Sequence, residues 1–211
     1  MNEAHLREEL AYWGKSMFDR GLTAGSSGNI SVRLGDGMLI TPTNSCLGRL
    51  DPSRISRLDG SGRHVDGDAP SKELPLHRAL LETRPDANAV VHLHSTYATA
   101  LSCLNGLDED DCVDPVTPYV VMRNGKVKLL PYVPPGDPGA GEMIRKLDGC
   151  YSAMLLANHG PVVSGRDLSS AIFAAEELEE TAKLMFVLRG ADARRLDAGQ
   201  AAELRKRFPA M

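Results

Sequence analysis

Two histidines separated by one residue stand at the end of a short apolar segment. Residues 89–91 are Ala-Val-Val, which predicts a buried strand, and His92 and His94 follow at its end. Residues i and i+2 of a strand point to the same side of a sheet, so two imidazoles in this arrangement can bind one cation. Taken alone, the pair is equally compatible with two structural histidines at a strand end.

A third histidine and one acidic residue extend this candidate metal site. His159 lies just past a second predicted buried strand, residues 153–157. Three histidines at strand ends suit a catalytic metal with an open position for substrate. Glu73 lies one turn into a predicted helix, where the helix dipole favours an ionised carboxylate. Alone, His159 is compatible with a structural role, and Glu73 with a general dipole interaction.

The chain contains six histidines, and the other three carry weaker signals. His77 is four residues after Glu73, and we expect it to pack or to form hydrogen bonds rather than to bind metal. His5 and His64 belong to no motif, so we expect both at the surface.

Three segments are candidates for binding an anion. Residues 25–29, Gly-Ser-Ser-Gly-Asn, precede a predicted strand, and residues 41–45, Thr-Pro-Thr-Asn-Ser, follow one. Small and hydroxyl-bearing residues let backbone N–H groups approach phosphate oxygens. Ser71 and Lys72 stand at a helix start, where free N–H groups favour an anion. Each segment alone is typical of a turn, and none is a P-loop or a dinucleotide fingerprint.

The elements that position these residues follow from periodicity and turn residues. Apolar spacing predicts helices at residues 6–17, 71–82, 96–104, around 143–147 and 167–188, and a short polar helix at the C-terminus. Hairpins are predicted at 30–32 with 38–40 and at 54–58 with 63–65, and further strands at 89–91, 119–122, 127–130, 153–157 and 161–163. The pattern indicates one α/β domain over residues 1–211 with an antiparallel or mixed sheet.

Composition excludes several classes of protein. The 211 residues have a net charge of −4, so no basic excess favours a nucleic-acid partner. No run of residues approaches the ~18 apolar residues of a membrane helix. The first fifteen residues lack the apolar stretch of a signal peptide, so we expect a cytoplasmic protein. Reduced thiols are therefore expected at all four cysteines: Cys46, Cys103, Cys112 and Cys150.

Five segments together resemble the class II aldolase/adducin family, from about Leu6 to Gly190. They are GSSGNISVR, MLITPT, PSKE, DANAVVHLHS and ANHGP, in the order and at the spacing of that family. The resemblance implies a three-layer α/β/α domain with a central, mostly antiparallel sheet. It also implies one divalent metal per subunit, usually zinc, although histidine sites also accept manganese, iron, cobalt or nickel. A homotetramer with active sites between subunits is a further implication.

The resemblance assigns roles residue by residue. It implies that His92, His94 and His159 are metal ligands, and that Glu73 is the acid/base residue, which also ligates the metal when substrate is absent. Tyr119 occupies the place of a catalytic tyrosine contributed by a neighbouring subunit. The implied phosphate- and substrate-binding residues are Gly28, Asn29, Thr43, Asn44, Ser71 and Lys72.

Two of these positions depart from the pattern of the fuculose-phosphate aldolases. Asn44 replaces a glycine, and asparagine tolerates the left-handed conformation better than most residues. Lys72 replaces a serine and adds a positive charge beside the anion site. A substrate with a second anionic group, such as a carboxylate, gives a reason for this charge.

Within the family, six segments look like those of the 3-oxo-tetronate 4-phosphate decarboxylases, which belong to pathways that degrade four-carbon acid sugars. They are TNSCLG (43–48), PSKE (70–73), HLHST (92–96), ALSCL (100–104), TPYVVM (117–122) and EELEETAK (176–183). The implied reaction yields dihydroxyacetone phosphate and CO2 through a metal-stabilised enediolate, with Glu73 or a water that it orients returning a proton. One alternative is a sugar-phosphate aldolase or 4-epimerase of the fuculose- or ribulose-phosphate type. The other is a metal-free, adducin-like interaction domain.

Overall fold

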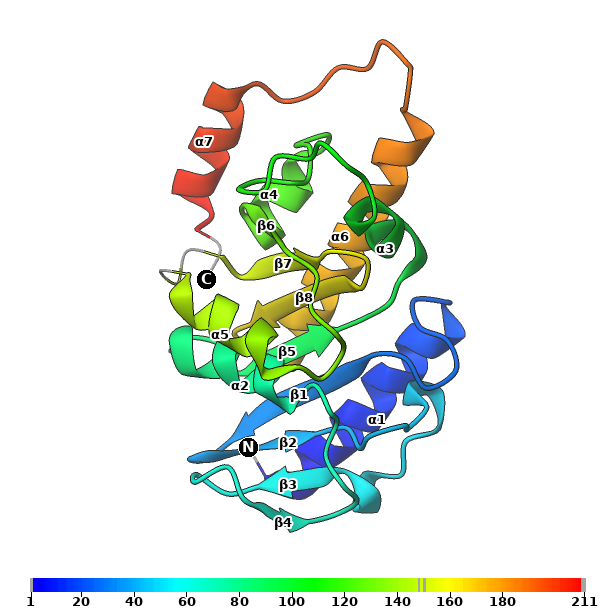
Figure 1. Cartoon of the computed structure of the whole chain (residues 1–211), viewed down its shortest axis with the longest axis vertical. Helices are drawn as coiled ribbons and strands as arrows, with labels where there is room; N and C mark the ends of the chain where they lie inside the picture. Colours follow the sequence, from blue (N-terminus) through cyan, green and yellow to red (C-terminus); the bar gives the residue numbers. More distant parts are fainter. Residues whose placement is uncertain (1, 148, 150, 210–211) are drawn as a thin grey trace.

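An eight-stranded sheet forms the middle layer of the computed structural model, which describes residues 2–147, 149 and 151–209 (Figure 1). The strand order is β4-β3-β2-β1-β5-β8-β7-β6. Neighbouring strands are antiparallel except β6 and β7, which are parallel, so the prediction of a mostly antiparallel sheet is confirmed. The strands are β1 (Asn29–Leu34), β2 (Gly37–Ile40), β3 (Ser56–Leu58), β4 (His64–Asp66), β5 (Ala89–His92), β6 (Val127–Leu130), β7 (Ala153–Leu156) and β8 (Gly160–Gly165).

Helices cover both faces of this sheet (Figure 1). The helices are α1 (Glu3–Asp19), α2 (Leu74–Thr83), α3 (Thr96–Ser102), α4 (Pro118–Asn124), α5 (Pro138–Lys146), α6 (Leu168–Val187) and α7 (Ala198–Arg207), with short 3-10 turns η1 (Leu47–Arg49) and η2 (Pro52–Arg54). α2 and α5 pack together on one face, and α1, α3, α4 and α6 pack on the other, where α7 contacts α4. The predicted three-layer α/β/α arrangement is confirmed.

Alternating apolar residues explain why the sheet is buried on both sides. In β5, Ala89 and Val91 join the core cluster under α6, while Val90 joins the cluster under α2. Because side chains alternate along a strand, one continuous apolar run serves two helical layers. The same alternation directs His92, two residues after Val90, toward the face that carries α2.

One predicted strand is wrong. Residues 119–122 form part of helix α4, which begins at Pro118 and ends before Gly125. The β-branched pair Val120 and Val121 favoured a strand, but both side chains are buried where α4 packs on α6 and α7. Proline at the first helical position and a glycine with φ of 65° after the last one are the local signals for this short helix.

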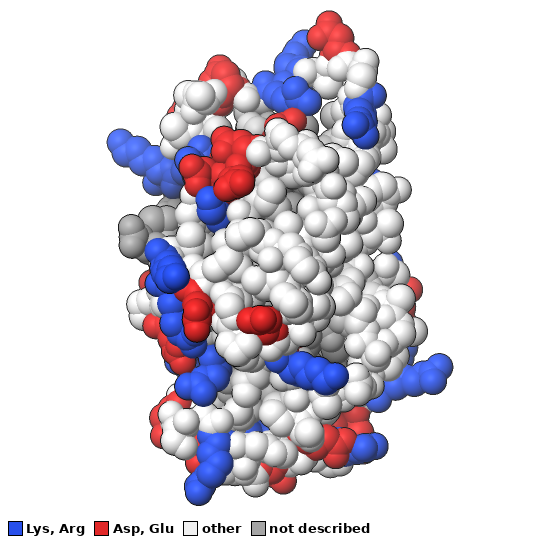
Figure 2. All heavy atoms as spheres, in the orientation of Figure 1, with Lys and Arg blue, Asp and Glu red and all other residues white. Residues whose placement is uncertain are grey.

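The remaining predicted helices and strands are confirmed, with ends that differ by a few residues. Cys46, Cys103 and Cys112 are free thiols, and Cys150 lies outside the described residues. Every helix in the described part of the chain is too short or too polar to cross a bilayer. On the face shown in Figure 2, positive and negative side chains are interspersed along the periphery, and the centre carries few charges.

Candidate metal centre

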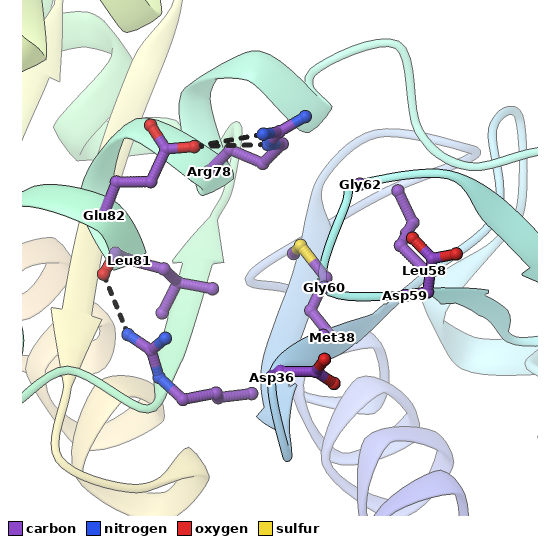
Figure 3. A pocket seen from close by; sticks show the side chains of 11 residues that line it. Asp36, Met38, Leu58, Asp59, Gly60, Gly62, Arg78, Leu81 and Glu82 are labelled. Atoms are coloured by element: carbon purple, nitrogen blue, oxygen red, sulfur yellow. Dashed lines mark hydrogen bonds and ion pairs between the residues drawn. The ribbon is translucent and has the colours of Figure 1, made fainter.

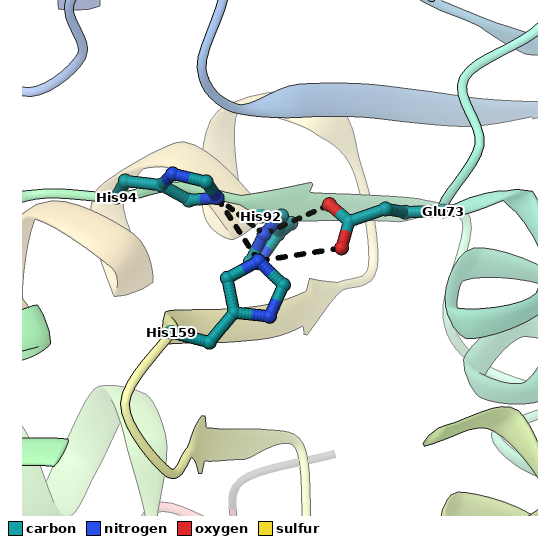
Figure 4. A group of neighbouring side chains, drawn as sticks. All are labelled: Glu73, His92, His94 and His159. Atoms are coloured by element: carbon teal, nitrogen blue, oxygen red, sulfur yellow. Dashed lines mark hydrogen bonds and ion pairs between the residues drawn. The ribbon is translucent and has the colours of Figure 1, made fainter. Parts of the chain in front are cut away.

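Four side chains from distant parts of the chain converge at one end of the central strands. His92 is the last residue of β5, His94 follows it, His159 lies in the turn between β7 and β8, and Glu73 precedes α2. One ligand atom from each of these residues lies within 4.8 Å of all the others. Figure 4 shows the three imidazoles and the carboxylate pointing toward a common centre.

The distances between these atoms are those of ligands around a single small ion. His94 Nε2 lies 3.1 Å from both His92 Nε2 and His159 Nε2. The Glu73 carboxylate places Oε2 2.9 Å from His92 Nε2 and Oε1 3.4 Å from His159 Nε2. Ligands bound tetrahedrally to zinc at about 2.0–2.1 Å are roughly 3.3 Å apart.

A backbone contact of His92 Nδ1 determines which ring nitrogen of this histidine carries a proton. His92 Nδ1 is 2.9 Å from the backbone carbonyl oxygen of Pro161, which can only accept, so Nδ1 carries the proton. The fully buried His92 therefore presents Nε2 to His94, His159 and Glu73. A histidine ligand whose other nitrogen donates to a carbonyl is the usual arrangement in metal sites. This donor set fits a divalent metal.

Burial and neighbouring charges determine the protonation of the group. Burial, with the nearby His92 and His159, lowers the pKa of His94 to about 4, and burial followed by His92 lowers the pKa of His159. Burial alone would raise the pKa of Glu73, but contacts with His92, Asn29 and His159 outweigh it and hold this pKa far below its usual range. Two imidazoles are thus neutral at pH 7, and Glu73 is ionised.

Glycine allows the turn that carries His159 to lie close to β5. A Cβ on Gly160, which has φ of 150°, would lie 2.4 Å from the Leu93 carbonyl oxygen. Leu93 stands between the two histidines of the β5 end, so any side chain at 160 would push His159 away from them. Gly28, with φ of 80°, makes a similar approach, because a Cβ at this position would lie 3.1 Å from the His92 carbonyl oxygen.

Glu73 stands at the helix start rather than inside it. α2 begins at Leu74, so Glu73 occupies the N-cap position and its N–H donates to Ser71 Oγ at 3.3 Å. The expectation that Ser71 caps a longer helix is wrong, because Pro75 fits only in the first turn and therefore sets the start close to itself. The Asn29 side-chain amide donates to Glu73 Oε2 at 3.0 Å.

The predicted anion-binding segments lie around the same end of the sheet. Asn29 pairs with His92 in the register between β1 and β5. Pro42 forms a β-bridge with Pro70, and the Thr43 N–H donates to the Ala69 carbonyl oxygen, which brings residues 41–45 beside residues 70–72. Asn44 adopts a positive φ of 55°, as expected for a residue in place of a glycine.

Lys72 and Tyr119 are both exposed. Lys72 stands beside the loop before α5, where a Cβ on Gly136 would lie 3.2 Å from Lys72 Cβ. Tyr119 lies on α4 with 58% of its surface exposed. It is not one of the four clustered residues, since α4 packs against α6 and α7 on the other face of the sheet.

His77 and Ser31 are polar residues near the cluster. His77 was expected to pack or to form hydrogen bonds, but its partners were not evident from the sequence. His77 is fully buried between Ser31 and Asn29, and it contacts both through its ring nitrogens. The alternation of Asn29 and Ser31 with the apolar Ile30 and Val32 was the available signal, because it puts both polar residues on the face toward α2.

A separate pocket lies at the other end of β1 (Figure 3). It borders the turn between β1 and β2, about 17 Å from Asn29 along a six-residue strand. Its Arg33 donates to the Leu81 carbonyl oxygen and its Arg78 pairs with Glu82. No predicted site residue lines this pocket, so it is distinct from the metal centre.

Known proteins share this fold and much of this sequence. A 3-oxo-tetronate 4-phosphate decarboxylase from Pectobacterium atrosepticum is 52% identical over 204 residues, which cover 96% of this chain and 94% of that protein. The crystal structure of YgbL from Escherichia coli superposes with a TM-score of 0.94 at 51% identity, covering 96% and 99% of the two chains. An L-fuculose 1-phosphate aldolase superposes with a TM-score of 0.86 at 28% identity, covering 96% and 95%.

The family match covers most of the chain. Residues 8–186 match the class II aldolase and adducin N-terminal domain. These residues include the whole metal centre and every predicted phosphate-binding residue. With the full-length relatives and the shared three-layer fold, this match shows that the chain belongs to the class II aldolase and adducin family.

Proposed function

We propose that the chain is a divalent-metal-dependent lyase that decarboxylates 3-oxo-tetronate 4-phosphate. The observation that carries this proposal is the 52% identity, over 96% of the chain, to a protein of that activity. The intact cluster of three histidines and a glutamate supports the metal dependence, since class II aldolases use a divalent metal. The whole chain, residues 1–211, is proposed to act as one catalytic domain.

The reaction breaks one carbon–carbon bond. The substrate has its carboxylate at C1, a hydroxyl at C2 and the oxo group at C3, so it is a β-keto acid. When the C1–C2 bond breaks, CO2 leaves and the electron pair passes through C2 onto the C3 oxygen, which gives an enediolate. Protonation of C2 yields dihydroxyacetone phosphate, and each turnover consumes one proton.

The clustered residues supply what this reaction needs. A divalent ion held by His92, His94 and His159, with Glu73 as a further ligand when substrate is absent, would act as a Lewis acid for the negative charge developing on the substrate oxygens. Neutral imidazoles leave the charge of such an ion undiminished. Glu73 is ionised before the reaction, so the proton for C2 must come from water. Glu73, or a water that it orients, delivers this proton to C2. Zinc is the proposed ion.

The loops around the cluster are proposed to hold the two anionic groups of the substrate. Backbone N–H groups and small side chains bind the phosphate, and the exposed Lys72 adds a positive charge for the phosphate or the carboxylate. Fixing both ends of the substrate orients the C1–C2 bond at the metal. The residues proposed for this role are Gly28, Asn29, Thr43, Asn44, Ser71 and Lys72.

A homotetramer with sites between subunits is proposed for the assembly. The exposed Tyr119 lies on α4, which packs on the face of the sheet opposite α2, so it would serve a neighbouring subunit. Decarboxylation releases no aldehyde that needs protonation, and we propose that the Tyr119 hydroxyl donates to the enediolate instead.

The test is an assay of the purified protein with 3-oxo-tetronate 4-phosphates of both configurations at C2. We expect CO2 and dihydroxyacetone phosphate in equal amounts, and loss of both products after treatment with a chelator. Restoration by zinc, compared with manganese, iron, cobalt and nickel, identifies the working metal. A protein that folds and retains no stoichiometric metal would instead support the adducin-like alternative.

An aldolase acting on a sugar phosphate is the second candidate, favoured by the TM-score of 0.86 to an L-fuculose 1-phosphate aldolase. It requires the same metal and phosphate sites and the same enediolate. The two activities differ in the leaving group, which is CO2 in one and an aldehyde in the other. Cleavage of fuculose or ribulose phosphate without turnover of the tetronate would reverse our choice.

A further inference from the structure

A buried row of polar side chains runs from strand β1 to the metal centre. Ser31 Oγ lies 2.7 Å from His77 Nδ1, and His77 Nε2 lies 2.5 Å from Asn29 Oδ1. The Asn29 amide nitrogen then reaches Glu73 Oε2 at 3.0 Å. Ser31 and His77 have no exposed surface, and Asn29 is 6% exposed. The row therefore exchanges hydrogen bonds among its own members.

The hydrogen bonds in this row have only one consistent direction. A carboxylate that ligates a metal can only accept, so Asn29 faces Glu73 with its NH2 group and His77 with its carbonyl oxygen. His77 Nε2 must then donate. With the single proton of a neutral imidazole on Nε2, His77 Nδ1 accepts from the Ser31 hydroxyl at 2.7 Å.

We infer that His77, set by Ser31, is a positioning residue that holds the Asn29 amide with its NH2 group toward Glu73. Reversing the amide would place its carbonyl oxygen against a carboxylate and leave the buried His77 N–H facing a second donor. The row thus fixes the donor that aims the Glu73 carboxylate at the metal centre. The inference rests on the proposed function in one respect, that Glu73 acts on the substrate.

Substitutions at His77 separate this role from simple packing. His77→Leu keeps an apolar side chain in the buried site but removes the donor to Asn29. His77→Gln keeps a donor, because its amide nitrogen can reach the place of the imidazole Nε2. Leu80→Ala is the matched control, since Leu80 is fully buried on the same helix and packs in the core cluster instead of the polar row.

We expect His77→Leu to lower kcat and metal affinity by about 10–100-fold, the usual range for partners of ligating groups, with a smaller change in KM. His77→Gln should recover a substantial part of both, and Ser31→Ala should lose less than His77→Leu. Leu80→Ala should lower Tm while retaining kcat and metal affinity. Metal affinity is measured by competition with a chromophoric chelator, and therefore does not depend on activity.

A measurement on the wild-type protein tests the inference even if the variants do not fold. In histidine labelled with 15N, the zinc-loaded protein should show His77 as the neutral tautomer protonated at Nε2. A His77 protonated at Nδ1, or a His77→Leu variant with unchanged kcat and metal affinity, would overturn the inference. If the wild-type protein does not act on the tetronate, the proposed function fails, while the tautomer and the metal affinities still decide this inference.

Discussion

His92 is the side chain on which the geometry of the metal centre depends most. It has no exposed surface, its Nδ1 is held by the Pro161 carbonyl oxygen, and its Nε2 faces the other three groups. A carbonyl on the neighbouring strand β8 therefore decides which nitrogen of His92 is available. This constraint is local to one hydrogen bond, yet it links two strands that are far apart in the sequence.

Replacing His92 with alanine should remove the metal and the activity but not the fold. The lost imidazole is one of three histidine ligands, and the remaining groups cannot complete the ligand set. Metal content by elemental analysis and turnover should fall together, while circular dichroism stays close to wild type. His5→Ala, which changes an exposed histidine of α1, is the control and should alter neither. Full turnover with bound metal in the His92 variant would contradict the assignment.

Glu73→Gln should separate metal binding from proton transfer. Glutamine is nearly isosteric and the three histidines remain, so the metal should still bind, although more weakly. The amide cannot carry the proton to C2, and general acid–base groups typically contribute about 10²–10⁴-fold, so turnover should fall by roughly this factor. Single-turnover kinetics on the metal-loaded variant provide the measurement. An unchanged rate would remove Glu73 from the acid/base role.

At the scale of elements, helix α6 holds three segments in place: the end of α1, the start of α4 and the start of α3. Glu176 pairs with Arg20 at the end of α1, and Glu177 accepts from Thr117 just before α4. Glu179 is buried, and its two carboxylate oxygens accept from the backbone N–H groups of Tyr97 and Ala98 at 2.9 and 2.8 Å. These N–H groups open α3, only three residues after His94. α6 thus fixes the segment that follows His94, one of the candidate metal ligands.

Glu179→Ala should weaken metal binding from a distance. Two buried N–H groups would lose their acceptor, which costs about 1–3 kcal/mol for each unsatisfied group. We expect a lower Tm and weaker metal affinity, because the start of α3 positions His94. Glu180→Ala is the matched control, since Glu180 is the next residue and its side chain is 64% exposed. Equal effects of the two substitutions would show that the capping contact is unimportant.

Helix α4 shows how a short sequence pattern can predict the wrong type of element. Val120 and Val121 favour a strand by propensity, but packing against α6 and α7 outweighs this preference in a seven-residue helix. Long periodic segments such as α1 and α6 are predicted correctly, because many residues contribute to the same face.

At the scale of the whole molecule, a net charge of −4 does not exclude an anionic substrate. Acidic and basic side chains are dispersed over the face shown in Figure 2, while three histidines inside the fold can hold a divalent cation. The field at the metal centre is therefore set by a few buried groups rather than by the overall charge. The same overall charge supplies no basic excess that would favour a nucleic-acid partner.

Mixed oligomers test whether a site is shared between subunits. His92→Ala and Tyr119→Phe each should leave a nearly inactive protein when purified alone. If Tyr119 serves the neighbouring subunit, each restored site needs His92 from one subunit and Tyr119 from its neighbour. Co-expression in equal amounts should therefore restore about one quarter of the sites. A site within one chain would show no restoration, because every subunit would carry one substitution. Light scattering on the same samples gives the oligomeric state.

Residue types and local spacing were sufficient to nominate the metal ligands and most of the elements. His92, His94 and His159 stand at the ends of apolar strands, and strand endings are readable from a few neighbouring residues. The pattern of strands and helices predicted one α/β domain, and the family resemblance implied its three layers.

Contacts across the sheet could be decided only by the tertiary structure. The pairing of β1 with β5 sets Asn29 beside His92, and the packing of α2 on β1 sets His77 between Ser31 and Asn29. Such contacts join residues more than forty positions apart, and hydrophobic burial of whole elements determines them rather than any local preference. The identity of the ligands was therefore open to inference from the chain, while their hydrogen-bonded support was not.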